Sequence, residues 1–238
     1  MMEDKVERES LKDLETIVKE AKNWKLNLVV IGGYAIRAYT KGYRYTKDID
    51  LVSPKKDIGG LIALLKDLGY KVKETQFGLK GKKKLNGGFI NLDISIHEVW
   101  DVSTDKRYPA DEILKESRSM EISGFFEKGR KIRVKASVAS LEDLIILKLM
   151  TRGRERDVID IISLLIDRWN NLDLEKLAIK CSRSNLSRHI RDQALGIVAL
   201  IRLGEARKIW LSITGQRLMR KTETELIRHL REIDKRLS

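Results

Sequence analysis

The 238 residues of the chain are enough for one large domain or two modest ones, and a hydrophobic content of 42% is ordinary for a globular protein with a buried core. A single cysteine, Cys181, and three scattered histidines exclude an intramolecular disulfide and a cysteine-rich zinc site. The 35% of charged residues and the net charge of +13 favour a polyanionic partner, although a solvated basic surface would also account for them.

Nothing in the sequence directs the chain into a membrane. The first twenty residues are dense in charge and do not resemble a signal peptide. No apolar run in the sequence approaches the ~18 residues that a membrane span requires. We therefore expect a cytoplasmic protein without a membrane partner.

The first half of the chain alternates between helical and strand patterns. Apolar residues at helical spacing predict an opening helix over about 4–23. A β-branched run at 26–31 stops at Gly32-Gly33, which indicates a buried strand and a sharp turn. A glycine- and lysine-rich hairpin tip is expected at 78–88. The other elements that we expect here are helices at 34–39 and 57–69 and strands at 48–52, 70–75, 89–96, 120–122 and 131–135.

The second half of the chain carries helical patterns only. Ser140 and the acidic residues that follow it resemble a helix N-cap with acids in the first turn. Helical faces continue at 144–150, 158–165 and 169–238, where three glycines (Gly196, Gly204 and Gly215) are candidate interruptions. We therefore expect an α/β (α+β) domain with a mixed central sheet over residues 1–137 and a basic all-helical domain over residues 138–238.

Three aspartates lie on two of the expected strands. Asp48 and Asp50 are two residues apart, so in a strand they project from the same face. Asp93 lies in a second apolar strand and completes a three-carboxylate cluster if the two strands are neighbours. Such a cluster can hold two Mg²⁺ ions about 3.5–4 Å apart. The alternative is that Asp-x-Asp is structural, because strand ends and turns often carry such pairs.

Gly32-Gly33 lies where the first strand gives way to a helix. Glycine allows the backbone to approach a phosphate closely, and the helix N-terminus that follows offers free N–H groups to an anion. The alternative for the pair alone is a tight turn without a ligand. Combined with Asp48 and Asp50, the arrangement is far more specific than either part.

Three motifs together resemble a known superfamily. The motifs are Val30-Ile31-Gly32-Gly33-Tyr34-Ala35, Thr46-Lys47-Asp48-Ile49-Asp50-Leu51 and Leu92-Asp93-Ile94. They resemble the DNA polymerase beta-type nucleotidyltransferases and are most similar to the branch with the AbiEii-type toxins and related small transferases. The motifs cover about residues 26–96, and a looser likeness extends over 141–165.

The resemblance implies a fold and a role for each motif residue. It implies the nucleotidyltransferase fold, with Gly32 and Gly33 holding the triphosphate of an NTP substrate. Asp48, Asp50 and Asp93 would bind Mg²⁺, two ions in all, with Mn²⁺ as a substitute. Asp93 would also position or deprotonate the acceptor hydroxyl.

Basic residues outside these motifs are candidates for binding phosphates. Lys148 and Arg152 lie four apart on one expected helix face, and Arg154 and Arg156 follow them. The alternative is that these side chains are solvated or pair with Asp157 and Asp160. The candidates for a nucleic-acid contact in the expected hairpin tip, whose alternative is a solvated tip, are Lys82, Lys83 and Lys84.

The predicted activity is Mg²⁺-dependent transfer of a nucleoside monophosphate from an NTP to a hydroxyl group of an acceptor. The net charge of +13 favours RNA, such as a tRNA end, although a protein acceptor stays open. Two other interpretations compete with it. One is a nucleic-acid-binding protein that keeps the fold without turnover, and the other is the toxin of a toxin–antitoxin pair, held by an antitoxin-like protein.

Overall fold

The computed structural model describes residues 2–41, 44–86, 88–126 and 130–238. Contacts divide the chain into two compact units, each assembled from three segments. The first unit comprises Met1–Ala38, Tyr45–Val99 and Pro109–Ser140, and the second comprises Tyr39–Arg44, Trp100–Tyr108 and Leu141–Ser238. The domain boundary predicted between residues 137 and 138 stays a prediction.

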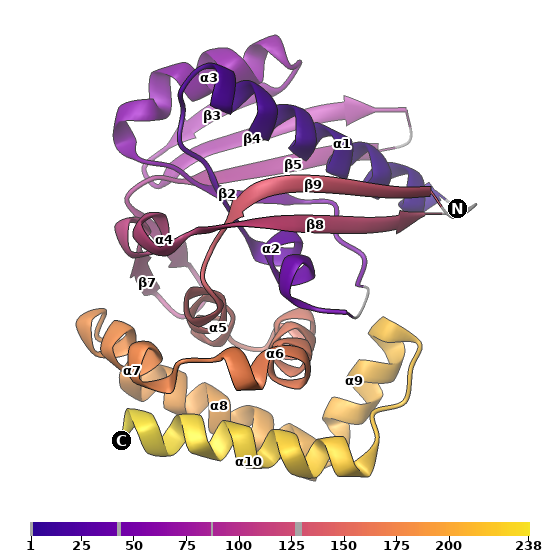
Figure 1. Cartoon of the computed structure of the whole chain (residues 1–238), viewed down its shortest axis with the longest axis vertical. Helices are drawn as coiled ribbons and strands as arrows, with labels where there is room; N and C mark the ends of the chain where they lie inside the picture. Colours follow the sequence, from indigo (N-terminus) through magenta and orange to yellow (C-terminus); the bar gives the residue numbers. More distant parts are fainter. Residues whose placement is uncertain (1, 42–43, 87, 127–129) are drawn as a thin grey trace. The chain divides into compact units, whose positions relative to one another are not determined.

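The first unit is built on a mixed sheet of seven strands in the described part of the chain (Figure 1). Its strands are β1 (Val29–Ile31), β2 (Ile49–Val52), β3 (Lys71–Thr75), β4 (Gly78–Leu85), β5 (Gly88–Ser95), β8 (Arg118–Phe126) and β9 (Arg130–Val138). They are ordered β3-β4-β5-β2-β1-β9-β8. The β2–β5 and β1–β9 pairs are parallel, and the other neighbours are antiparallel. This sheet confirms the predicted fold class.

Helices cover the sheet of the first unit. The helical elements are α1 (Met2–Asn23), α2 (Gly32–Tyr39), η1 (Lys55–Asp57), α3 (Ile58–Asp67) and α4 (Ala110–Glu116). Figure 1 shows α1 and α3 on one side of the sheet. Helix α2 lies against α1, where Tyr34 and Arg37 form hydrogen bonds with Glu7. Apolar strand positions such as Leu51, Ile90 and Leu92 are buried, and so are the α1 residues Leu11 and Leu14. The strand positions that alternate with them carry the polar side chains of the opposite face.

The glycine- and lysine-rich segment expected as a hairpin tip is instead a strand. Residues Gly78–Leu85 form β4, which pairs along its length with β3 on one side and β5 on the other. Lysine and glycine have weak strand propensity, but two flanking strands satisfy the backbone of a central strand. The expected strands near 120–122 and 131–135 are also longer than predicted, because β8 and β9 pair along their lengths, from Arg118 opposite Val138 to Phe126 opposite Arg130.

The second unit is helical apart from one hairpin. Its helical elements are α5 (Leu141–Met150), α6 (Glu155–Arg168), η3 (Trp169–Asn171), α7 (Leu174–Arg183), α8 (Ser187–Arg202), α9 (Glu205–Thr214) and α10 (Arg220–Leu237). The predicted helical C-terminal half is confirmed. Gly204 and Gly215 flank α9 with φ of 78° and 70°, whereas Gly196 lies inside α8 and does not interrupt it. Among the described residues, no helix is both long and apolar enough to cross a membrane.

A hairpin and two buried acids join the parts of the second unit. The hairpin strands are β6 (Glu98–Asp101) and β7 (Lys106–Pro109). Asp143, in the first turn of α5, accepts hydrogen bonds from the Tyr108 hydroxyl at 2.6 Å and from Lys180 Nζ at 2.7 Å. Glu142 accepts one from the Asp173 backbone N–H at 3.1 Å. The acids of this first turn thus act as buried anchors between elements.

Candidate active site

The three motif aspartates lie on one face of the first unit's sheet. In the parallel β2–β5 pair, Asp50 lies directly opposite Asp93. Ile49 and Leu51, which flank Asp50, are fully buried on the other face. Asp48 immediately precedes β2 and lies two residues from Asp50, so it belongs to the acidic face. The predicted neighbourhood of the two strands is therefore confirmed by their register.

Gly32 begins α2 and lies against the Asp50 carboxylate. Its φ is +65°, in the left-handed region that favours glycine. A Cβ atom at this position would lie 2.0 Å from Asp50 Oδ2, so any larger residue displaces the acid. The predicted glycine turn is thus the first turn of the helix itself, and it adjoins the acidic pair. Free N–H groups at this helix start suit a phosphate.

Two polar side chains of neighbouring strands contact the acids. Asn91 Nδ2, on β5, donates a hydrogen bond of 2.9 Å to Asp48 Oδ1. Lys80 Nζ, on β4, lies 3.5 Å from Asp93 Oδ1. Neither residue is predicted from the sequence to have a role at the acids. The signal for Asn91 was its position two residues before Asp93, which places both on one face.

The donor set at this face fits a hard divalent cation. Asp48, Asp50 and Asp93 offer carboxylate oxygens, which Mg²⁺ and Mn²⁺ prefer. In the described part of the chain, no three His, Cys, Asp or Glu side chains are already arranged as metal ligands. Asp48 bonds to Asn91, and Asp93 pairs with Lys80. Both acidic side chains would therefore have to rotate toward Asp50 to form a set of three carboxylate ligands.

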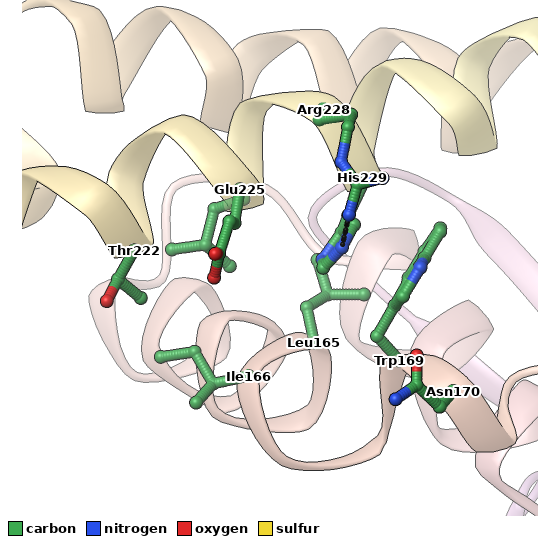
Figure 2. A pocket seen from close by; sticks show the side chains of 9 residues that line it. Leu165, Ile166, Trp169, Asn170, Thr222, Glu225, Arg228 and His229 are labelled. Carbon is green, nitrogen blue, oxygen red and sulfur yellow. Dashed lines mark hydrogen bonds between the residues drawn. The ribbon is translucent and has the colours of Figure 1, made fainter.

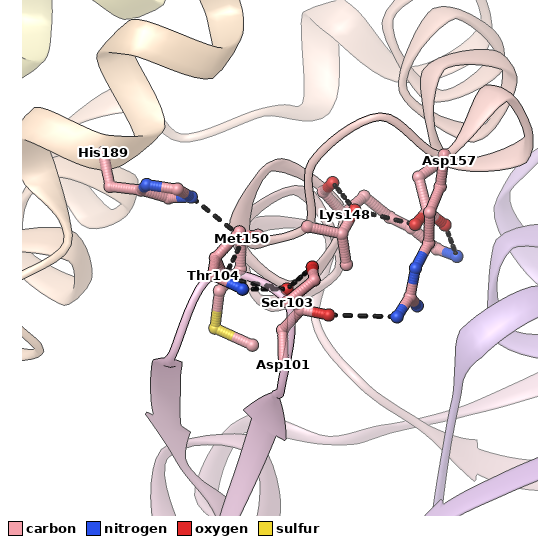
Figure 3. A network of polar contacts seen from close by, with 9 residues as sticks. Asp101, Ser103, Thr104, Lys148, Met150, Asp157 and His189 are labelled. Carbon is pink, nitrogen blue, oxygen red and sulfur yellow. Dashed lines mark hydrogen bonds and ion pairs between the residues drawn. The ribbon is translucent and has the colours of Figure 1, made fainter.

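The predicted phosphate-binding residues Lys148, Arg152 and Arg156 belong to the second unit. Lys148 Nζ donates to Asp157 Oδ1 at 2.6 Å (Figure 3) and lies 2.8 Å from Asp160 Oδ2. Burial disfavours its charged form, but the two carboxylates outweigh burial and raise the pKa of Lys148. Arg152 and Arg156 are exposed. Lys148 thus pairs with both acids, and its contact with a phosphate stays a prediction.

Asp160 also binds an arginine from an earlier segment. Arg44 donates to both Asp160 oxygens, from Nε at 2.7 Å and from a terminal nitrogen at 2.8 Å. This two-bond geometry is the strong arrangement for arginine with a carboxylate. Asp157 and Asp160, the acids expected as alternative partners of the basic residues, therefore position Lys148 and Arg44.

Asp101 organises the turn of the β6–β7 hairpin, as Figure 3 shows. It accepts hydrogen bonds from the Ser103 and Thr104 hydroxyls at 2.6 and 2.8 Å. Arg154 lies 3.0 Å from the other carboxylate oxygen. Burial raises the pKa of Asp101, but these donors outweigh it and hold the pKa below its usual value. Arg154, a further candidate for phosphate, thus anchors this turn.

A pocket of about 310 Å³ lies elsewhere in the second unit, between the α6–η3 segment and α10 (Figure 2). His229 of α10 stacks on Trp169 of η3, with ring centroids 4.0 Å apart and planes 8° from parallel. Arg228 lies 3.1 Å from His229 Nε2. No motif in the sequence indicated this stack, because its two rings are sixty residues apart in the chain.

The predicted nucleic-acid contacts Lys82, Lys83 and Lys84 do not share one face. Lys82 and Lys84 are exposed on the acidic face, where Lys82 lies opposite Asn91. Lys83 points to the other face, where its Nζ lies 2.9 Å from Asp13 of α1 and over the Tyr70 ring. The strand pleat thus separates Lys83 from the other two.

The fold is that of nucleotidyltransferases. A candidate nucleotidyltransferase from Helicobacter pylori is 18% identical to this chain, with a TM-score of 0.54 over 97% of this chain and 96% of that one. JHP933, also from H. pylori, is 18% identical, with a TM-score of 0.53 over 95% and 90%. Among curated proteins, none matches the chain. At this identity the two structures show a shared fold.

The family model for the nucleotidyl transferase AbiEii toxin of type IV toxin–antitoxin systems matches residues 17–236. The chain therefore belongs to the AbiEii nucleotidyltransferase family, and it is a nucleotidyltransferase. The resemblance drawn from the three motifs is confirmed. The match also extends through the helical second half, for which only a looser likeness was expected.

Proposed function

We propose that this chain transfers a nucleoside monophosphate from an NTP to a hydroxyl group of an RNA acceptor, with Asp48, Asp50 and Asp93 at the reacting centre. The main support is the register that sets Asp50 opposite Asp93, beside the helix start at Gly32. An acidic face next to a helix start suits a triphosphate, because N–H groups bind phosphate oxygens while carboxylates bind the accompanying cations.

The proposed reaction is an in-line displacement at phosphorus. The acceptor hydroxyl oxygen bonds to the α-phosphorus while the bond from that phosphorus to the pyrophosphate oxygen breaks. Asp93 accepts the hydroxyl proton, and the backbone at Gly32 and Gly33 binds the triphosphate. Two Mg²⁺ or Mn²⁺ ions held by Asp48, Asp50 and Asp93 would neutralise the phosphates and stabilise the leaving pyrophosphate. Orientation and electrostatic stabilisation supply most of the rate.

Lys148, Arg152 and Arg156 are the proposed contacts for the outer phosphates of the NTP. Asp157 and Asp160 raise the pKa of Lys148, so its ammonium group carries a full charge at neutral pH. Arg152 and Arg156 are exposed and available to a ligand. Arginine and lysine are the usual side chains for phosphate oxygens.

Two further features of the activity are the class of acceptor and its possible inhibition by a partner protein. A net charge of +13 favours RNA over protein as the acceptor, because a polyanion is attracted along its whole length. A second candidate function is that of a toxin whose transfer is held by an antitoxin partner. Its support is the family's description as a toxin of type IV toxin–antitoxin systems.

The test is a transfer assay with each NTP labelled on the α-phosphate, Mg²⁺ and total RNA. We expect label on RNA with the wild type and a loss of about 10²–10³-fold in the Asp48→Asn/Asp50→Asn variant. The matched control is Asp67→Asn, which changes an exposed acid at the end of α3 and keeps wild-type transfer.

Three outcomes would contradict the proposal. Equal labelling by the double aspartate variant would remove Asp48 and Asp50 from the reacting centre. Label on protein in a lysate, with none on RNA, would make the acceptor a protein. No transfer from any NTP, together with tight RNA binding without Mg²⁺, would favour a binding protein that keeps the fold without turnover.

A further inference from the structure

Five exposed lysines share the face of the sheet that carries the acids. From Lys80 to Lys84 of β4, every second residue is a lysine of this face, and the register sets the first of them opposite Asp93 and the next opposite Asn91. In β3, two further lysines lie directly opposite these two. We call this set the lysine track, and its members are Lys71, Lys73, Lys80, Lys82 and Lys84.

The lysine track contains two directly opposed pairs of like charge. Lys71 lies opposite Lys82 and Lys73 lies opposite Lys80 across the β3–β4 pair. Like charges directly opposite each other destabilise a sheet. Within the track, Lys80 Nζ lies 3.5 Å from Asp93 Oδ1, whereas the charge of Lys83 meets Asp13 on the other face of the sheet. A bound polyanion relieves this repulsion.

The spacing of the lysine track suits the backbone of a nucleic acid. Alternate residues of an antiparallel strand are about 6.8 Å apart, so Lys80, Lys82 and Lys84 form a regular row of charges. A polynucleotide strand carries one phosphate for each nucleotide and matches such a row with successive phosphates. The row leads along β4 to Asp93, the proposed acceptor of the hydroxyl proton.

An exposed aromatic ring lies beside the lysine track. Phe89 is 44% exposed and lies opposite Lys84 in the β4–β5 pair. Lys82 Nζ is 4.1 Å from the centre of its ring. Basic grooves with aromatic rings on which bases stack are the general device for binding single-stranded nucleic acids. An acidic polypeptide would use the charges of the track but has no bases to stack on the ring.

We infer that the lysine track and Phe89 bind the single-stranded end of the RNA acceptor and direct its terminal hydroxyl to Asp93. This inference rests on the proposed function for the chemistry at Asp93. The binding itself is measured without NTP, so the two proposals fail separately. Transfer that is absent while the track binds RNA overturns the proposed function alone.

The test is binding of a labelled single-stranded RNA of about 12 nucleotides, within the usual site size, to the full chain at several salt concentrations. The track variant replaces Lys71, Lys73, Lys82 and Lys84 by Gln and leaves Lys80 beside Asp93 unchanged. We expect the slope of log K against log salt to fall by about 3, because each lysine lost removes about 0.7 from the slope with single strands.

The matched control removes the same charge elsewhere in the first unit. It replaces four exposed lysines of α1 and η1 by Gln, namely Lys19, Lys22, Lys55 and Lys56. The control keeps the wild-type slope to within about 1 if the track carries the binding. Circular dichroism and thermal melting test whether both variants fold. If the track variant unfolds, a Lys82→Gln/Lys84→Gln variant replaces it, and we expect its slope of log K against log salt to fall by about 1.4.

A single substitution separates stacking from charge. Phe89→Ala is expected to weaken binding of the single strand by about tenfold, without changing the salt slope, because one base loses its stacking partner. Binding of duplex RNA is expected to be unaffected by this substitution. Equal weakening of duplex and single strand would overturn the single-strand assignment.

Three further results would overturn the inference. The first is an unchanged slope in the track variant, and the second is an equal fall in the control, which would assign binding to the overall charge. The third is that polyglutamate displaces the labelled RNA as effectively as unlabelled RNA does at the same concentration of negative charge. That result would assign the lysine track to an acidic protein partner.

Discussion

At the scale of the residue, the acidic face depends on a position that has no side chain. Gly32 combines a left-handed backbone with direct contact to Asp50, so two independent constraints meet in one residue. A turn needs only the first constraint. The second constraint arises because Asp50 and the start of α2 occupy the same space, and it links the glycine to the chemistry of the acid.

Gly32→Ala is expected to lower nucleotidyl transfer by about 100-fold and stability by more than the 1–2 kcal/mol that a left-handed alanine costs. The added Cβ would lie 2.0 Å from Asp50 Oδ2 and displace the carboxylate. Transfer assays and urea unfolding measure the two effects.

Gly204→Ala supplies the control for backbone strain. Gly204 has a φ of +78° with no atom within 4 Å of the added Cβ, so it bears the backbone cost without a collision. We expect transfer by this variant at the wild-type rate. If Gly32→Ala also transferred at the wild-type rate, contact between Gly32 and Asp50 would have no role in the reaction.

At the scale of the element, the sequence predicted those strands whose pattern is local. The alternation around Asp50 and Asp93 identified two strands with acids on one face, and the structure has both. The sequence did not establish that these two strands are neighbours, because their pairing depends on the path of the chain between them. The register of Asp50 with Asp93 comes from that path.

The elements that the sequence missed lack such a local pattern. In β4, lysines and glycines occupy a central strand, and Leu79 is its only fully apolar buried position. The partners β3 and β5 supply its hydrogen bonds, so tertiary pairing overrides its weak propensity. Asn91 was missed for a related reason, since its partner Asp48 is 43 residues away and no spacing rule joins them.

Helices α5 and α7 are joined by a buried ion pair whose loss is expected to be costly. The side chains of Lys180 and Asp143 are 3% and 0% exposed. Lys180→Met leaves the Asp143 carboxylate buried without its cation, so we expect a loss of about 3–5 kcal/mol in the free energy of unfolding. Urea denaturation measures this loss.

The matched control for this pair is Lys208→Met. Lys208 pairs with Glu205 at 2.7 Å, but both side chains are largely exposed, at 73% and 45%. We expect a loss below about 1 kcal/mol, because exposed ion pairs contribute little. If both variants lost a similar free energy of unfolding, breaking the buried Lys180–Asp143 pair would be no more destabilising than breaking an exposed pair.

At the scale of the whole molecule, the pH dependence of stability has a contribution from the stack of His229 on Trp169. Burial and then the neighbouring Arg228 lower the pKa of His229, while Glu225 and Glu232 oppose them. A lowered pKa in the folded state means that the unfolded chain binds the proton more readily. Stability from this group is therefore complete above the unfolded pKa of about 6.5 and falls as the pH decreases below it.

We expect the wild type to lose thermal stability between about pH 7 and pH 5, and His229→Phe to lose less, because phenylalanine keeps an aromatic ring beside Trp169 but does not titrate. Melting temperatures over this range test the difference. His97→Gln, a change at an exposed histidine, is the control and should follow the wild type. A pH profile of His229→Phe identical to that of the wild type would assign the acid sensitivity to other groups.

The chain passes between its two units five times, at 38/39, 44/45, 99/100, 108/109 and 140/141. During synthesis, Arg44 and Tyr108 therefore leave the ribosome before the carboxylates of Asp160 and Asp143 with which they bond. No single cut in the polypeptide can release both units whole. A fragment that ends at residue 140 carries two short pieces of the helical unit without their partners, so a biochemist who needs the sheet alone must replace both pieces with linkers.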